Sequence, residues 1–115
     1  MITKERKQFL KTLDKELDYH LKASPDEVKV VLNNGIYNSI PRDIAKIVDD
    51  IMAKFPSADL TVGNEGSRVL YVTLYSGDAD LKAYVSFMET LAAKYEADEF
   101  NMQSSLSLKY RFWWD

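Results

Sequence analysis

The stretch Ser-Ser-Leu-Ser-Leu-Lys-Tyr-Arg-Phe-Trp-Trp, residues 104–114, alternates between apolar and polar side chains and decides the fold class. Successive side chains of a β-strand point to opposite faces, so a repeat of two residues predicts a strand with one buried face. One face would carry Leu106, Leu108, Tyr110, Phe112 and Trp114, and the other Ser105, Ser107, Lys109, Arg111 and Trp113. We expect one strand that begins at Met102 or Gln103 and ends at Trp114.

A second alternating run lies upstream, at residues 68–76. Its apolar face is Leu70, Val72 and Leu74, and its other face is Val69, Tyr71, Thr73 and Tyr75. A short strand at residues 59–63 precedes it, and Asn64-Glu65-Gly66 between the two runs is typical of a hairpin turn. The sequence therefore predicts an antiparallel hairpin that joins the C-terminal strand in one sheet.

Three other segments have the spacing of amphipathic helices. Residues 3–22 carry the apolar stripe Phe9, Leu10, Leu13, Leu17 and Leu21. Residues 40–55 begin after Ser39, an expected N-cap, and end before Pro56. Residues 79–97 form the third expected helix, after Gly77 and Asp78.

Residues 24–34 support two interpretations. Ser24-Pro25-Asp26-Glu27 forms a capping box with proline at the first helical position, which favours a helix. Val28, Val30 and Leu32 alternate with Lys29, Val31 and Asn33, and valine prefers strands. We favour the strand because it completes the order βαββαβ, a ferredoxin-like split βαβ sheet with two helices on one face. The alternative is a helix-rich α+β fold with a three-stranded sheet.

Part of the chain also resembles a known family. Gly35-Ile36-Tyr37, then Pro41 and a helix, then Phe55-Pro56-Ser57-Ala58-Asp59 is similar to the start of the HPr family of phosphocarrier proteins. Tyr37 stands where that family has its phospho-accepting histidine, so the resemblance implies no activity. It implies only a strand at residues 28–33.

The composition predicts one domain, residues 1–115, with the N-terminal helix at 1–22 and the sheet unit at 26–115. The chain has 115 residues, 46% of them hydrophobic, no cysteine and a net charge of −3. Without cysteine there is no disulfide framework, zinc ribbon or thiol nucleophile. The charged start and the short apolar runs give no export signal and no membrane span, so we expect a cytoplasmic protein.

The search for catalytic or metal-binding residues is negative, so we expect no enzyme, no cofactor and no metal. His20 has no partner at a recognisable spacing, and a packing or surface role is favoured. Asp49 and Asp50 are adjacent on a helix and point in different directions. The two glycines of Gly63-Asn64-Glu65-Gly66 join two strands, whereas a phosphate loop leads into a helix.

One face of the predicted sheet could bind a partner. Its residues combine aromatic rings, a hydroxyl and cations, and Lys29 would join them if its segment is a strand: Tyr71, Thr73, Tyr75, Lys109, Arg111 and Trp113. Such a face needs a cover, which the N-terminal helix or a second copy of the chain could supply. The other interpretation is a ligand-binding face.

These features favour a small, acidic, non-enzymatic interaction protein that docks on another protein and forms a homodimer. An inhibitor, antidote or adaptor, of the kind encoded by phages and other mobile elements, fits the size and the lack of catalytic groups. The alternative is a module that binds single-stranded nucleic acid, with bases stacked on the aromatic face. The acidic net charge makes nucleic acid the less favoured partner.

Overall fold

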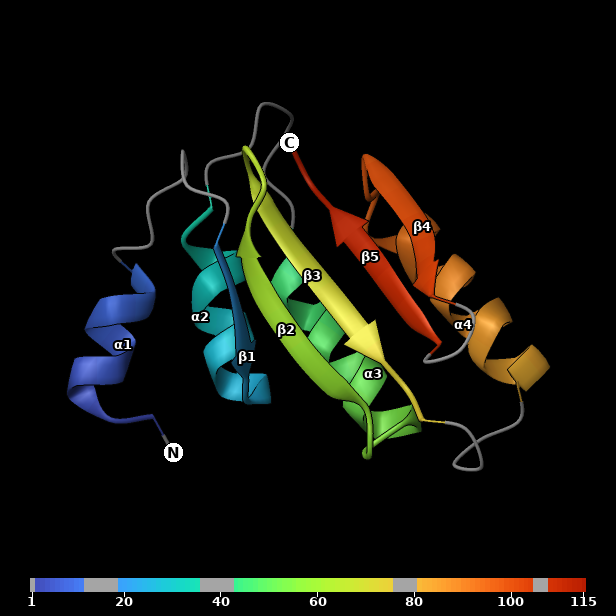
Figure 1. The fold of residues 1–115 in the computed structure, drawn as a ribbon, viewed down its shortest axis with the longest axis horizontal. Helices are drawn as coiled ribbons and strands as arrows, with labels where there is room; N and C mark the ends of the chain where they lie inside the picture. Colours follow the sequence, from blue (N-terminus) through green and yellow to red (C-terminus); the bar gives the residue numbers. More distant parts are fainter. Residues whose placement is uncertain (1, 12–18, 36–42, 76–80, 105–107) are drawn as a thin grey trace.

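The computed structural model describes residues 2–11, 19–35, 43–75, 81–104 and 108–115, and these form an α+β fold (Figure 1). The elements are α1 (Lys4–Lys11), β1 (Tyr19–Ala23), α2 (Pro25–Asn33), the 3₁₀ turn η1 (Ile44–Lys46), α3 (Ile47–Lys54), β2 (Asp59–Asn64), β3 (Arg68–Thr73), α4 (Leu81–Lys94), β4 (Glu99–Ser104) and β5 (Lys109–Trp113). No helix in the described ranges is long and apolar enough to cross a membrane.

The strands form one five-stranded sheet in the order β1-β2-β3-β5-β4, with every neighbouring pair antiparallel. Helices α2, α3 and α4 lie on the same face of this sheet, and α1 lies beside α2 at the β1 edge (Figure 1). The opposite face has no helix of the described segments over it. The sheet therefore has one face in the core and one outside it.

The core lies between the sheet and the three helices. Its centre is the pairing of β3 with β5, which sets Leu70 opposite Phe112 and Val72 opposite Tyr110, all of them buried. Tyr84 of α4 reaches into this layer, where its single hydroxyl proton is shared between the carbonyls of Val72 (3.2 Å) and Leu108 (2.9 Å). A buried hydroxyl that is hydrogen-bonded in this way avoids the cost of desolvation without a partner.

The strand expected at residues 28–33 is wrong, because α2 occupies this segment. The capping box forms: Glu27 N donates to the Ser24 hydroxyl (3.3 Å) and Ser24 N donates to the Glu27 carboxylate (2.9 Å). Val28, Val31 and Leu32 share one buried helical face. The ferredoxin-like arrangement is therefore not confirmed, and the strand implied by the HPr resemblance is absent here.

The helix expected over residues 3–22 is also wrong in extent, since α1 ends at Lys11 and residues 19–23 are strand β1. Leu21 faces the core from β1, while His20 and Lys22 lie on the other face, so the two-residue period fits this segment. Pairing with β1 also satisfies backbone groups along one side of β2. Leu13 and Leu17 lie outside the described residues.

The C-terminal segment holds two strands rather than the single expected one. Strands β4 and β5 pair as a hairpin, with a register shift between Met102 and Ser104. The alternation from Leu108 to Trp114 is confirmed, although Leu108 itself has a positive φ of 48° and precedes the strand. The sheet thus has five strands, not the three of the alternative fold.

The remaining expected elements are confirmed with somewhat different bounds over the described residues. The hairpin of β2 and β3 is present, and the helix expected at 79–97 ends at Lys94, before Glu96 with its φ of 53°. The helix expected at 40–55 is η1 and α3, which end before Phe55 and Pro56. The expected N-cap Ser39, with Pro41, lies outside the described residues.

Replacing the cap of α2 tests why this segment is a helix. We expect Ser24→Ala to lower the free energy of unfolding by about 1 kcal/mol, because one amide at the helix start loses its acceptor. Urea denaturation followed by circular dichroism measures the change. Ser86→Ala, at an exposed position within α4, is the matched control and should be neutral or slightly stabilising. Equal stability of both variants would contradict a role for the cap.

Candidate functional site

The sheet face opposite the helices is made of three rows of side chains, which we call the open face. Cross-strand partners share a face of a sheet, so the strand registers define the rows. The first row is His20, Val69, Trp113 and Glu99, with Gly63 between β1 and β3; the second is Lys22, Thr61, Tyr71, Arg111 and Asn101; the third is Asp59, Thr73 and Lys109.

The six residues predicted as an interaction surface lie together on or beside this face. Tyr71 and Thr73 come from β3, the central strand, and pair directly with Arg111 and Lys109 of β5. Trp113 is two residues further along β5. Tyr75 follows the end of β3, is 52% exposed and donates its hydroxyl to Asp59 (2.9 Å).

Lys29 does not belong to the open face. It lies on α2, in the helical layer, and forms an ion pair with Asp49 of α3 at 2.5 Å. The cause is the helix at residues 25–33: the sequence interpretation placed Lys29 on the sheet only because it made this segment a strand.

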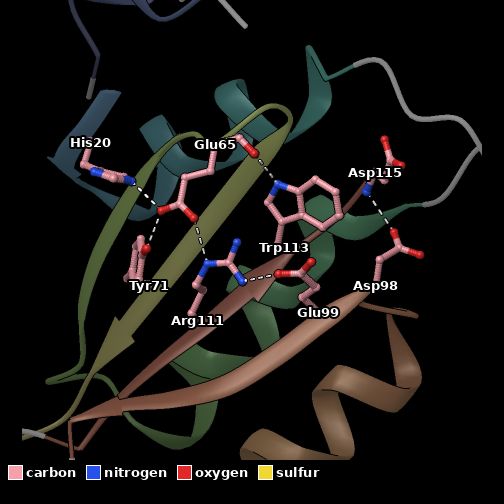
Figure 2. Close-up of polar contacts among 8 residues, drawn as sticks. All are labelled: His20, Glu65, Tyr71, Asp98, Glu99, Arg111, Trp113 and Asp115. Carbon is pink, nitrogen blue, oxygen red and sulfur yellow. Dashed lines mark hydrogen bonds and ion pairs between the residues drawn. The ribbon is translucent and has the colours of Figure 1, made fainter. Parts of the chain in front are cut away.

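The centre of the open face is a carboxylate from the β2–β3 turn, Glu65. Its oxygen Oε2 accepts hydrogen bonds from the Tyr71 hydroxyl and from Nε2 of His20 (2.6 Å), and Oε1 accepts from Nε of Arg111 (2.8 Å) (Figure 2). An ionised carboxylate can only accept, so the His20 ring carries its proton on Nε2 in this contact. Three strands thus direct one donor each at a single side chain.

The neighbours of this carboxylate hold the donors in place. The Arg111 side chain is 13% exposed and also donates through Nη1 to Glu99 (2.8 Å). The Trp113 indole nitrogen donates to the backbone carbonyl of Glu65 (2.9 Å), so the turn is bound to β5 as well (Figure 2). Lys109 Nζ lies 4.8 Å from the centre of the Tyr71 ring, within the range of a cation–π contact.

The local sequence explains why the turn folds over this face. Asn64 and Arg68 are the last paired residues of the hairpin, and Gly66 between them has a φ of 79°, a conformation that favours glycine. Asn64, Ser67 and Arg68 are buried, and Arg68 donates to the carbonyl of Asn34 (3.3 Å) beyond the end of α2. These buried residues fix the base of the turn, and from it the Glu65 side chain extends over the open face.

These contacts change the acidity of the groups involved. Burial raises the pKa of Glu65, but the hydrogen bonds from Tyr71, Arg111 and His20 outweigh it, and the net pKa lies below its usual 4.5. Burial and the bond to Glu65 raise the pKa of Tyr71 to about 12. Burial also lowers the pKa of Arg111, yet its two carboxylate partners raise it overall. Glu65 and Arg111 are therefore held in their charged forms at neutral pH.

Sequence reasoning missed two members of this cluster. Glu65 was interpreted only as part of a hairpin turn, and His20 was assigned to a helix. The register of β1 against β2 and the turn geometry bring His20, Glu65 and Tyr71 together, and neither is visible in a local pattern. One sequence signal could have pointed to Glu65: it is a charged residue in the turn of a hairpin, and Tyr71 of that hairpin lies on the open face.

The expected cover by the N-terminal helix is wrong for the described part of that helix. Helix α1 packs against α2, with Leu10 fully buried, and Arg6 pairs with Glu27 there. Phe9 of the expected stripe is 42% exposed. Helix α1 therefore belongs to the helical layer, and Glu65 of the β2–β3 turn contacts the open face instead.

On the open face, the Glu65 carboxylate accepts from three donors: the Tyr71 hydroxyl, Nε2 of His20 and Nε of Arg111. Among the described residues, no three His, Asp or Glu side chains are placed to hold a metal ion. A shallow cavity of about 590 Å³ lies on the helical side, lined by residues of η1, α3 and the end of α4, including Asp50 and Lys94. No family model, curated protein or solved structure matches the chain.

The hydrogen bonds to Glu65 predict a pH-dependent contribution to stability. A carboxylate whose pKa is lower in the folded state stabilises the fold fully above its unfolded pKa, near 4.5, and loses this effect as the pH falls through the folded value. We expect Glu65→Gln to lower the free energy of unfolding by about 1–3 kcal/mol at pH 7 and by less at pH 3.

Urea denaturation at both pH values measures this difference. Glu89→Gln, at an exposed position of α4, is the control and should change stability little at either pH. A loss in Glu65→Gln that is the same at pH 3 and pH 7 would mean that the charge of Glu65 is not what matters.

Proposed function

We propose that this protein is a non-enzymatic interaction module that docks on a protein partner through the open face. The observation that carries the proposal is the ordered cluster of Tyr71, Arg111 and Trp113, held by Glu65 on the one sheet face that has no described helix over it. An inhibitor, antidote or adaptor is the class of protein that this surface fits.

The residue types support a protein partner. Tyrosine, tryptophan and arginine contribute most at the centres of protein interfaces, and these three lie on adjacent strands. Their polar groups are already fixed by hydrogen bonds, so binding would cost little side-chain entropy. Trp113 and Tyr71 remain partly exposed, which leaves aromatic surface for contact.

The charges of the face favour protein over single-stranded nucleic acid, the alternative partner. Nucleic-acid binding relies on cations that neutralise phosphates. Arg111 is engaged by Glu65 and Glu99, and Lys22 pairs with Asp59 at 3.3 Å. The described part of the face therefore carries three cations, Lys22, Lys109 and Arg111, and three carboxylates, Asp59, Glu65 and Glu99. Their charges balance.

Truncation of the aromatic residues tests the docking surface. After capture of partners from the source cells and purification of the recovered protein, we expect Tyr71→Ala or Trp113→Ala to weaken binding by about 30-fold, or about 2 kcal/mol. Isothermal calorimetry measures the affinity, and sedimentation measures self-association on the same samples. A homodimer that is lost in both variants would identify a second copy as the partner.

The control is Leu81→Ala, which removes a side chain that is 51% exposed on α4, on the helical side. It should leave the affinity unchanged, whereas Leu70→Ala should lower stability by about 2–5 kcal/mol because it leaves a cavity in the core. Unchanged affinity in Tyr71→Ala and Trp113→Ala would contradict the proposal. So would salt-sensitive binding of mixed-sequence single-stranded oligonucleotides that Trp113→Ala or Arg111→Ala abolishes.

A further inference from the structure

We propose that His20, Tyr71 and Arg111 form a carboxylate-binding site, which Glu65 fills in the free protein and an acidic side chain of the partner fills in the complex. This inference rests on the proposed docking function and names the chemical group that the partner presents. Glu65 would then be an internal stand-in for the partner's aspartate or glutamate.

The backbone positions of the donors are set by the sheet, and the Glu65 carboxylate of the turn adds to contacts that their side chains also make elsewhere. Tyr71 and Arg111 are direct cross-strand partners on β3 and β5, and His20 lies on β1. Other contacts hold them as well: Arg111 donates to Glu99 (2.8 Å), and the His20 and Tyr71 rings meet edge to face with centres 5.4 Å apart. The arrangement of donors would therefore persist when the Glu65 side chain leaves.

The geometry of the site fits a planar carboxylate. One oxygen of Glu65 meets the Arg111 guanidinium, and the other meets both the Tyr71 hydroxyl and His20. Hydrogen bonds of this kind to an ionised acceptor are stronger than those between neutral groups. Any carboxylate delivered from outside at the same position would satisfy the same three donors.

Glu65 can leave the site without unfolding the hairpin. Asn64 and Arg68, on either side of the turn, are buried and paired, so the base of the turn stays fixed. The Glu65 side chain is 21% exposed, and Gly66 beside it is exposed, with open space where a side chain would begin. Rotation of the Glu65 side chain about its own bonds toward solvent is enough to vacate the donors.

Removal of the Glu65 carboxylate from the site also changes the net charge of the open face. The cations Lys22, Lys109 and Arg111 would then face two carboxylates, Asp59 and Glu99. A positive excess attracts an acidic partner, and displacement of Glu65 leaves its own charge in water. Exchange of one carboxylate for another keeps the number of hydrogen bonds constant, so the contacts around the site decide which one binds.

Chemical rescue with acetate tests the site in the full chain without any partner. Glu65→Ala leaves the donors and removes their occupant. We expect sodium acetate, against sodium chloride at equal ionic strength and pH 7, to raise its melting temperature by about 5 °C at ten times the dissociation constant, and further with the logarithm of the acetate concentration above it. The wild type and the double variant Glu65→Ala/Arg111→Gln should respond equally to both salts.

Nuclear magnetic resonance gives a second readout that does not depend on melting. The side-chain N–H signals of Arg111 and Trp113 should shift saturably with acetate in Glu65→Ala. If that variant does not fold, Glu65→Gln keeps the side-chain size, and acetate should displace the amide with the same shifts. Absence of saturable shifts, an equal response in the Arg111→Gln background, or a specific response to phosphate and not to acetate would each overturn the carboxylate site.

Affinity measurements with the purified partner distinguish a failure of this inference from a failure of the proposed function. With the purified partner, Glu65→Ala should bind more tightly than the wild type, about tenfold or more, because the internal competitor is gone. Weaker or unchanged binding by Glu65→Ala would overturn the inference, while the loss of binding in Trp113→Ala would still support docking through the open face.

Discussion

The pairing of β3 with β5 is the constraint on which the rest of the structure depends. A single register sets Leu70 opposite Phe112 on one face and Tyr71 opposite Arg111 on the other. The first pair forms the centre of the core under α4, and the second forms the centre of the open face. A slip of one residue would exchange the two faces, burying Arg111 and exposing Phe112, so the core packing fixes the site.

The distribution of helices explains why a turn carries a central role. Because α2, α3 and α4 pack on one face, the hydroxyl, imidazole and guanidinium groups of the other face need partners from elsewhere (Figure 1). Glu65 supplies its carboxylate to all three and its carbonyl to Trp113 (Figure 2). A charged residue in a hairpin turn thereby connects β1, β3 and β5, strands that are far apart in the sequence.

Local signals and periodic patterns disagreed at residues 24–34, and the local signal decided the structure. The capping box of Ser24 and Glu27 forms a helix there despite the alternating valines, since Val28, Val31 and Leu32 also share a helical face. Preference for a complete ferredoxin-like order misled the sequence interpretation. A different signal, the apolar stripe that ends at Leu21, extended the expected first helix through His20, where the chain forms an edge strand.

The sequence by itself determined the α+β class, the β2–β3 hairpin, the buried and open sides of β3 and β5, and the proximity of Tyr71, Thr73, Lys109, Arg111 and Trp113. These follow from residue periodicity, which acts over a few neighbours. Only the tertiary structure decided the strand order, the place of α1 and the meeting of His20, Glu65 and Arg111. Those depend on contacts between segments from 21 residues apart, as for Arg6 and Glu27, to 46 apart, as for Glu65 and Arg111, whose geometry no local pattern records.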